Sequence, residues 1–293
     1  MNLKTIKKIW LEIENSKKPP KFVKKINIIK FDEFKNEINN KNYEYINKII
    51  NNLYEGEAYI VREAAKASLK KIIIDISVEY DQKWTSSFHK MLNGTPNFHR
   101  IIDHDITQKY SLYAIKHSYY LYNWNIKSKL ESNFAKEAYK HWRYIKYLAG
   151  NSKNAYEKNI PSDGQIDRFQ IVNYPHGGGQ LRDHEDPRKN QRLVSGLIMS
   201  KKGIDFDTGG FYFRNKNNEI ENIEDLLEIG DSVMFYGSII HGVEPVDSHK
   251  KIDWTSKSGR WFIGMFVNDS DHIINRTTAL DLTNSTKFNT INN

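Results

Sequence analysis

The stretch NYPHGGGQLRDHEDP (residues 173–187) places three consecutive glycines shortly before His184 and Asp186. Glycine adopts backbone conformations that are closed to other residues, so the glycine run predicts a sharp turn between two strands. Side chains two positions apart on a strand share one face, so His184 and Asp186 should point to the same side and Glu185 away from it. The rival interpretation is a phosphate-binding loop, but the Lys-Ser/Thr pair and the helix that such loops need do not follow. The stretch therefore predicts a strand that presents an imidazole and a carboxylate to one site.

A third ligand is offered downstream by GDSVMFYGSIIHGVEPV (residues 230–246), where His241 follows the end of a strand-like segment. Two imidazoles and one carboxylate on one face of a metal leave the opposite positions open, an arrangement that suits non-haem Fe(II). Each histidine taken alone is more often a surface or hydrogen-bonding residue. The ordered occurrence of all three in a strand-rich region favours a metal site made by His184, Asp186 and His241.

The next strand-like segment, GRWFIGMFV (residues 259–267), has Arg260 as its second residue. If Arg260 points inward with the phenylalanines on its face, it needs an anion, because an unpaired buried charge is costly. A guanidinium binds a carboxylate through two parallel hydrogen bonds. The alternatives are an outward Arg260 with Trp261 inside, or a structural ion pair. Lys250 and Lys257, in the preceding loop, are rival anion anchors, although a loop lysine is held less rigidly.

The character of the chain changes near residue 160. After it, short apolar segments alternate with turn residues, which is typical of an antiparallel sandwich or barrel. Before it, helix-forming stretches dominate. We therefore expect an α+β fold that is mainly β, with three parts: a mostly helical region (1–160) integral to the fold, a catalytic β core (161–270) and a polar tail (271–293).

Within the first part, the patterns predict several individual elements. The expected strands are an edge strand near INIIKF (26–31), GEAYIV (56–61) and the aromatic segment at 110–125; the expected helices cover 62–80 and 128–150; and 91–105 is expected as a loop.

The composition excludes some classes of site. The chain has no cysteine, so disulfides, thiolate metal sites and cysteine nucleophiles are excluded, and any metal must be held by His, Asp or Glu. The net charge of +8 comes from lysines that are spread along the chain without a nucleic-acid-binding motif, so no nucleic-acid partner is expected. No apolar run has the length of a signal peptide or a membrane span. We expect a cytoplasmic protein without a membrane partner, and the sequence gives no indication of its oligomeric state.

Taken in order, the motifs of residues 165–268 resemble those of the Fe(II)- and 2-oxoglutarate-dependent oxygenases, most closely the prolyl-hydroxylase-like branch. The matching features are Tyr174, the glycine turn Gly177–Gly179, His184 and Asp186, Gly209 and Gly210, Gly230 and Asp231, His241, Pro245 and Arg260. The resemblance implies a double-stranded β-helix (jelly-roll, cupin-like) core in the C-terminal half, with the helical half packed on it. It also implies that His184, Asp186 and His241 bind Fe(II), and that Arg260, helped by Tyr174, binds 2-oxoglutarate.

The activity implied by this resemblance is hydroxylation of an unactivated C–H bond, with consumption of O2 and 2-oxoglutarate and release of succinate and CO2. Because Asp186 fills a coordination position that a halide would need, hydroxylation is favoured over halogenation. A small-molecule substrate is preferred. The alternatives are a protein or peptide side-chain hydroxylase, and a cupin-like metalloenzyme or binding module that does not use 2-oxoglutarate.

Two further residues are candidates for substrate contact. Arg192 is a candidate to bind an anionic group of the substrate, with a surface salt bridge as the alternative, and Trp124 is a candidate to line the pocket, with a core position as the alternative. His99, Asp103 and His104 form a second polar cluster, which we interpret as loop chemistry or substrate contact and not as a second metal site.

Overall fold

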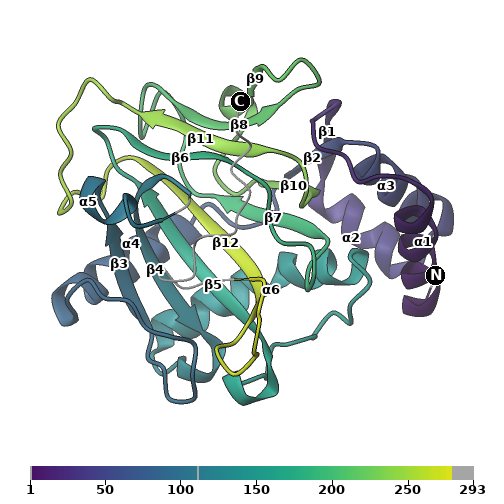
Figure 1. Cartoon of the computed structure of the whole chain (residues 1–293), viewed down its shortest axis with the longest axis horizontal. Helices are drawn as coiled ribbons and strands as arrows, with labels where there is room; N and C mark the ends of the chain where they lie inside the picture. Colours follow the sequence, from purple (N-terminus) through teal and green to yellow (C-terminus); the bar gives the residue numbers. More distant parts are fainter. Residues whose placement is uncertain (1, 111, 279–293) are drawn as a thin grey trace.

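The computed structural model describes residues 2–110 and 112–278 (Figure 1). The helices in this part of the chain are α1 (Leu3–Ser16), α2 (Phe31–Asn39), α3 (Tyr43–Tyr54), α4 (Leu69–Lys83), α5 (His104–Thr107) and α6 (Lys129–Leu148). The strands are β1 (Lys25–Lys30), β2 (Glu57–Arg62), β3 (Phe98–Ile102), β4 (Ala114–Tyr122), β5 (Gln165–Tyr174), β6 (Gly179–His184), β7 (Leu193–Ile198), β8 (Gly210–Arg214), β9 (Ile220–Asn222), β10 (Ser232–Tyr236), β11 (His241–Val246) and β12 (Arg260–Asp269).

The strands form two layers that are joined through one strand pair. The larger layer has the order β1-β2-β10-β7-β12-β5-β4, with β3 beside β4, and the smaller has the order β6-β11-β8-β9. Pairing of β4 with β6 links them. From β5 to β8 the chain enters the other layer with each successive strand, which is the winding of a jelly roll. Figure 1 shows β6, β11 and β8 grouped above the long strands β5 and β12. The expected β-rich jelly-roll core is therefore confirmed.

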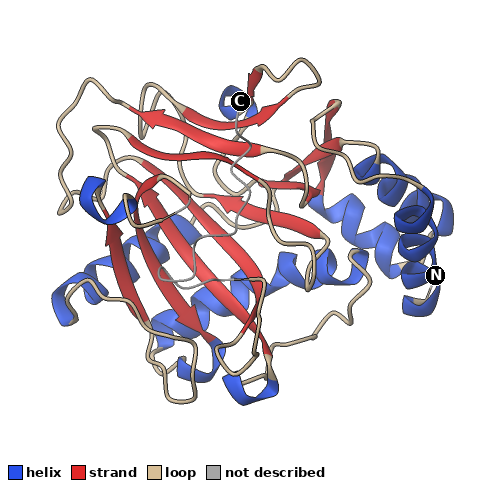
Figure 2. Ribbon diagram, viewed as in Figure 1, coloured by secondary structure: helices blue, strands red, loops and turns tan. Residues whose placement is uncertain are grey.

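Helices α4 and α6 cover the outer face of the larger layer (Figure 2). Helix α6 turns one apolar stripe to the sheet, with Phe134, Ala138, Trp142 and Ile145 buried at helical spacing. A capping box between Ser128 and Glu131 closes its N-terminus. The predicted helix at 128–150 is thus confirmed to within a few residues.

Helices make up most of the regular structure in the first half of the chain, but this half also adds β1 to β4 to the larger layer, which we did not expect to this extent. The predicted edge strand and the strand at 56–61 are confirmed as β1 and β2. The stretch expected as a loop contains β3, and the helix expected from residue 62 begins at Leu69. The helix begins later than predicted because contacts with a distant segment hold the preceding residues. Arg62 pairs with Asp231, and the backbone N–H of Ala65 donates to the carbonyl of Gly230 at 2.9 Å. These contacts hold residues 62–65 against the loop before β10.

The glycine run forms the predicted turn between β5 and β6. Gly177 has φ +89° and Gly178 has φ +103°. A Cβ on Gly177 would lie 2.4 Å from the backbone nitrogen of Ile252, so this position has no room for another residue. The turn brings β6 alongside β11, where the two histidines of interest meet.

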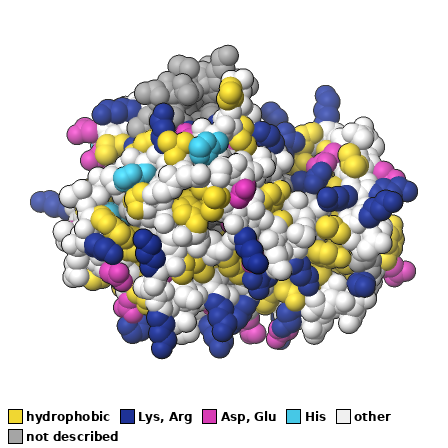
Figure 3. All heavy atoms as spheres, turned by 90° about the horizontal axis from the view of Figure 1, so that it is seen from below, with side chains coloured by type: hydrophobic (Ala, Val, Ile, Leu, Met, Phe, Trp, Pro, Cys, Tyr) yellow, Lys and Arg dark blue, Asp and Glu magenta, His cyan; other side chains and the backbone are white. Residues whose placement is uncertain are grey.

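Lysine and arginine side chains are spread over the face shown in Figure 3, among acidic and uncharged residues. That distribution agrees with the interpretation of the net charge as scattered lysines. No helix in the described residues has the length and apolarity needed to cross a membrane. Of the expected polar tail, residues 279–293 lie outside the described residues.

Candidate metal centre

The structure brings His184, Asp186 and His241 together. His184 ends β6, His241 begins β11, and the two are direct partners in the antiparallel ladder, with ring centroids 4.2 Å apart. Asp186 follows two residues after His184, and its backbone N–H donates to the carbonyl of Gly237 at 2.8 Å. One potential ligand atom from each of the three side chains lies within 4.8 Å of the other two. We call these residues the cavity triad.

Hydrogen bonds leave the ligand atoms of this triad free to bind. Nδ1 of His184 lies 2.9 Å from the carbonyl oxygen of Arg182, and Nδ1 of His241 lies 2.9 Å from that of Ile239. A carbonyl only accepts, so each Nδ1 carries a proton and Nε2 is the nitrogen left to bind a metal; Nε2 of His241 lies 3.5 Å from Oδ2 of Asp186. Such partners for the second nitrogen are typical of metal-binding histidines.

The electrostatics of the triad favour a bound cation. Burial lowers the pKa of His184 to about 4, so its imidazole is neutral near pH 7. Burial raises the pKa of Asp186, but the hydrogen bond and charge of His241 outweigh it, and the net shift of this pKa is downward. A neutral imidazole and an ionised carboxylate are the forms that bind metal ions.

The cavity triad borders a cavity of about 230 Å³ that lies between the two layers of strands. Both layers contribute to its wall, for example Phe211 and Val243 from the smaller one and Val172 and Phe262 from the larger one. An apolar wall around a small number of polar groups is the usual composition of a small-molecule site.

Arg260 points into this cavity and is 1% exposed. Its Nε donates to Oε2 of Glu224 at 2.8 Å, and its Nη2 is buried without a hydrogen-bond partner among the described residues. The outward alternative is therefore wrong for Arg260, although Trp261 is buried as well, in the core beneath the helices on the other face of β12. The structural ion pair is present, but it uses only one edge of the guanidinium.

Glu224 was not anticipated from the sequence. It lies in a short turn after β9, within the acidic run EDLLE, where nothing distinguishes it from a surface residue. Its Oε2 also accepts the backbone N–H of Phe211 at 2.6 Å. Glu224 thus binds the Nε edge of the Arg260 guanidinium and fixes its orientation.

Tyr174 also lines the cavity, directly opposite Arg260 in the β5–β12 ladder. The guanidinium carbon of Arg260 lies 6.0 Å from the centroid of its ring. Burial raises the pKa of Tyr174, so its hydroxyl remains a donor at neutral pH. This position is compatible with the role that the sequence resemblance implied.

The two candidate substrate residues lie elsewhere. Arg192 binds Glu14 through Nε and Nη2, at 2.7 and 2.9 Å, and is not part of the cavity wall. Its salt bridge, the alternative considered for it, is what the structure shows. Trp124 stacks on Tyr122 with centroids 4.5 Å apart and packs in a small core cluster outside the cavity. Neither side chain lines the cavities described here.

The rival anion anchors are also engaged away from the cavity. Lys250 pairs with Asp207 and Asp247, at 3.1 and 2.9 Å, and Lys257 pairs with Asp81. Neither lysine contributes to the cavity wall. Arg260 is therefore the anchor that the geometry supports.

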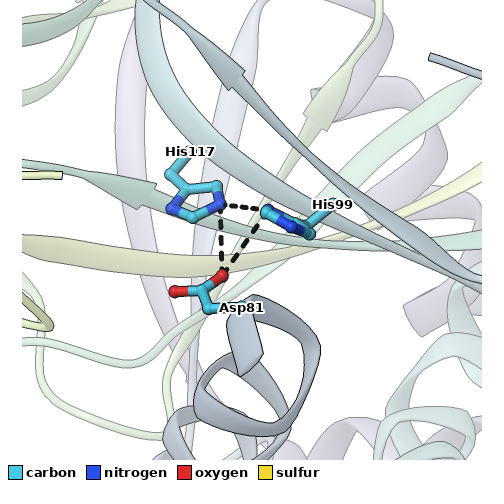
Figure 4. Close-up of side chains that lie close together, drawn as sticks. All are labelled: Asp81, His99 and His117. Carbon is cyan, nitrogen blue, oxygen red and sulfur yellow. Dashed lines mark hydrogen bonds and ion pairs between the residues drawn. The ribbon is translucent and has the colours of Figure 1, made fainter. Parts of the chain in front are cut away.

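The expected cluster of His99, Asp103 and His104 is divided. Asp103 caps the short helix α5, and His104 lies at the surface, 2.9 Å from the hydroxyl of Tyr113. His99 instead lies beside His117 and Asp81 (Figure 4).

Lys116, Arg168 and Gln170 are among the polar residues of the cavity wall that sequence reasoning missed. A signal was available, because Arg168 and Gln170 alternate with Phe169 and Ile171 and so share the face of Tyr174 on β5. Burial, followed by the charge of Arg168, lowers the pKa of Lys116 to about 8. Among the described residues, the buried Nε of Arg168 has no hydrogen-bond partner.

These three residues also line a second cavity of about 200 Å³ that adjoins the first. Its wall adds two more cationic side chains, Arg100 and Arg276, and a set of aromatic rings. One acid, Asp271, is present and pairs with Arg276 at 2.9 Å. The combined space is therefore lined by more positive than negative side chains.

The fold and the cavity triad together define a jelly-roll protein with a candidate metal centre between its sheets. No family model and no curated protein matches the sequence. Among solved structures, a C-terminally truncated protein from Neurospora crassa in its apo form is similar, with 13% identity, a TM-score of 0.50, and coverage of 82% of this chain and 94% of that one. The full-length form of that protein has been solved in complex with alpha-KG and thymine. This likeness shows that the two proteins share a fold.

Two prolyl hydroxylases are also among the solved structures that match this chain. A prolyl-4-hydroxylase from Pseudomonas putida is 11% identical with a TM-score of 0.47, over 76% of this chain and 97% of that one. A prolyl hydroxylase from Trichoplax adhaerens, in complex with a hypoxia inducible factor peptide fragment, is 12% identical with a TM-score of 0.48, over 79% of this chain and 92% of that one.

Proposed function

We propose that the chain is a non-haem Fe(II)- and 2-oxoglutarate-dependent oxygenase that hydroxylates an unactivated C–H bond of a small, anionic molecule, with release of succinate and CO2. One observation carries this proposal: the cavity triad and the unpartnered edge of the buried Arg260 border the same cavity. The fold shared with the Neurospora crassa protein supports it.

The residues of the cavity triad fit Fe(II). Two imidazole nitrogens and one carboxylate are its preferred protein ligands in sites that leave further positions open. His184 and His241 would bind through Nε2, since each Nδ1–H is already used by a backbone carbonyl. When bound, iron supplies the activation of dioxygen. The apolar walls around the triad exclude water from the reacting C–H bond.

Arg260 fits the distal carboxylate of 2-oxoglutarate. A buried guanidinium N–H without a partner is energetically costly, and an entering carboxylate would satisfy it through a charge-assisted hydrogen bond. Glu224 fixes Nε, so the guanidinium is oriented before the co-substrate arrives. Tyr174 would donate its hydroxyl to the same carboxylate.

The adjoining cavity defines the substrate that we propose. Lys116 and Arg168 lie where the two cavities meet, and among the described residues no ion pair neutralises either of them. Cations with aromatic neighbours, among them Tyr120 and Phe98, would bind a carboxylate or phosphate on a molecule with an apolar body. The volumes of about 230 and 200 Å³ suit a metabolite better than a protein loop.

The decisive experiment is a visible spectrum of the Fe(II)-loaded protein, recorded without oxygen while 2-oxoglutarate is added. A charge-transfer band that depends on 2-oxoglutarate and weakens in Arg260→Ala would support both halves of the proposal. Iron binding without such a band would favour a cupin-like metalloenzyme that does not use 2-oxoglutarate. Absence of iron binding would favour a binding module. Succinate release with a panel of anionic metabolites, and with peptides as the comparison, would then identify the substrate.

A further inference from the structure

A second His-His-Asp group lies between helix α4 and the larger layer of strands (Figure 4), on the face of that layer that the helices cover. Asp81 comes from α4, His99 from β3 and His117 from β4. Both histidines are 4% exposed, and neither lines the two cavities described above. We call these residues the helix-side cluster.

The spacing of the three ligand atoms suits one metal ion. Nδ1 of His99 lies 2.8 Å from Nε2 of His117, and each nitrogen lies 3.5 Å from Oδ1 of Asp81. For an ion at the usual ~2.1 Å from all three atoms, the angle at the ion would be about 85° between the two nitrogens and about 115° between each nitrogen and the oxygen. These angles lie near those of four- to six-coordinate sites, so the ion needs only small movements of the side chains.

The carboxylate of Asp81 supports this interpretation independently. Its Oδ1 is buried and has no hydrogen-bond partner among the described residues, although it points at both imidazoles. A distance of 3.5 Å is too long for a useful hydrogen bond but normal between two ligands of one ion. A cation between the rings would satisfy this orphaned oxygen.

Each of the three side chains also has a hydrogen-bond partner for the nitrogen or oxygen atom that would not bind the ion. Nε2 of His99 donates to the carbonyl of Trp84 at 2.8 Å, which leaves Nδ1 as the ligand atom. Nδ1 of His117 lies 3.0 Å from the hydroxyl oxygen of Tyr119, which can accept its proton once Nε2 binds a metal. The same hydroxyl lies 3.3 Å from Oδ2 of Asp81 and can donate to it. Such supporting hydrogen bonds orient metal ligands.

From this geometry we propose that the helix-side cluster is a second, structural metal site that binds a divalent ion such as Zn²⁺. His99, His117 and Asp81 supply three ligands and water completes the shell. Two nitrogens and one oxygen suit Zn²⁺, and the absence of thiolate is no obstacle. The ion would tie α4 to β3 and β4. This proposal does not depend on the function proposed for the cavity.

One neighbouring charge opposes the ion. Lys257 pairs with Asp81, and its Nζ lies 3.1 Å from the hydroxyl oxygen of Tyr119. Its ammonium group neutralises the carboxylate when the metal is absent. Removal of that charge should therefore strengthen metal binding without the loss of a ligand.

The test is a titration of chelator-treated full-length protein with Co²⁺ alone, followed by equilibrium dialysis and visible absorption. We expect two Co²⁺ per chain in the wild type, one in His241→Ala, where the cavity triad is broken, and none in His241→Ala combined with His117→Gln. His104→Gln is the matched control, because this histidine comes from the same segment but lies outside the cluster. It should leave both sites intact.

A second variant keeps the test decisive if His117→Gln fails to fold. In the His241→Ala background, Lys257→Met should tighten the remaining Co²⁺ binding by about tenfold, because a like charge near the ion is removed. One Co²⁺ per wild-type chain and none in His241→Ala would overturn the proposal. Unchanged Co²⁺ affinity in Lys257→Met, or a second ion that survives His117→Gln, would overturn it as well.

Discussion

The cavity triad and the helix-side cluster each contain two histidines and one aspartate on opposite sides of one sheet, yet their surroundings differ. In the cavity triad each Nδ1 is bound to a backbone carbonyl, and among the described residues no lysine pairs with the carboxylate. In the helix-side cluster the imidazoles bond to each other, and Lys257 pairs with Asp81. Of the two groups, the cavity triad is the one that borders the space between the sheets. Identical ligands can therefore serve different ends, and only those of the cavity triad adjoin space for a co-substrate and a substrate.

The largest expected effect comes from His241→Ala, which removes one ligand of the cavity triad. Loss of an outer partner of a metal ligand already costs ~10- to 100-fold in affinity or activity, so loss of the ligand itself should exceed 100-fold. Succinate release and Fe(II) affinity should fall together. His117→Gln should leave turnover within a few-fold of the wild type. A comparable loss of turnover in both variants would contradict the separation of the two sites.

Arg260→Gln should follow in size. A hydrogen bond to a charged group contributes ~1.5–3 kcal/mol, which predicts a roughly 10- to 150-fold higher dissociation constant for 2-oxoglutarate. The single variant also leaves Glu224 buried and unpaired, which destabilises the fold. The double variant with Glu224→Gln is the proper control, because the amide oxygen can still accept from Phe211. It should recover thermal stability but not 2-oxoglutarate affinity, and recovery of both would contradict the assigned role.

Lys116 and His117 are neighbours on β4 whose side chains lie on opposite faces, so they give a direct test of independence. Lys116→Met should raise the KM for an anionic substrate about tenfold, because one cation of the cavity wall is lost. Its Co²⁺ binding at the helix-side cluster should not change. Lys116→Arg should largely restore the KM. An equal loss of kcat with unchanged KM would show that Lys116 does not bind substrate.

The same alternation explains which parts of the site could be read from the sequence. His184 and Arg260 were accessible because each lies at the end of a strand bounded by turn residues, and Asp186 follows two residues after His184, where the alternation of side chains still places it near the same site. His241 could be placed at a strand end for the same reason. The β-rich second half and helix α6 followed from local periodicity and capping.

The errors arose where distant segments meet. Glu224 and Arg260 are 36 residues apart in sequence, and no local pattern reveals their pairing. Arg192 is a cation near the metal-binding motif and so was a reasonable candidate to bind substrate, but it forms a salt bridge with Glu14, which lies far away in the sequence. The helix-side cluster joins one helix to two strands, so Asp81 could not be assigned to His99 from spacing. Strand pairing in the first half, which the contacts of Arg62 and Asp231 help to set, was likewise not local.

The smallest effect that we expect is in the thermal stability of Lys257→Met relative to the wild type, which should be lower without Zn²⁺ and equal or higher with Zn²⁺. In metal-free protein this variant removes a partly exposed ion pair with Asp81, which contributes up to ~1 kcal/mol, so its melting temperature should fall slightly. With Zn²⁺ present the variant should be at least as stable as the wild type, because tighter binding to the folded state adds stability by mass action. Thermal unfolding of both proteins, with Zn²⁺ and with chelator, measures the crossover. His104→Gln should show no crossover, since it removes neither a ligand nor a competing charge. The contrary result would be that Lys257→Met loses the same stability with and without Zn²⁺. That result would mean that the helix-side cluster binds the ammonium group of Lys257 and no metal ion, so that only the cavity triad would remain a metal site.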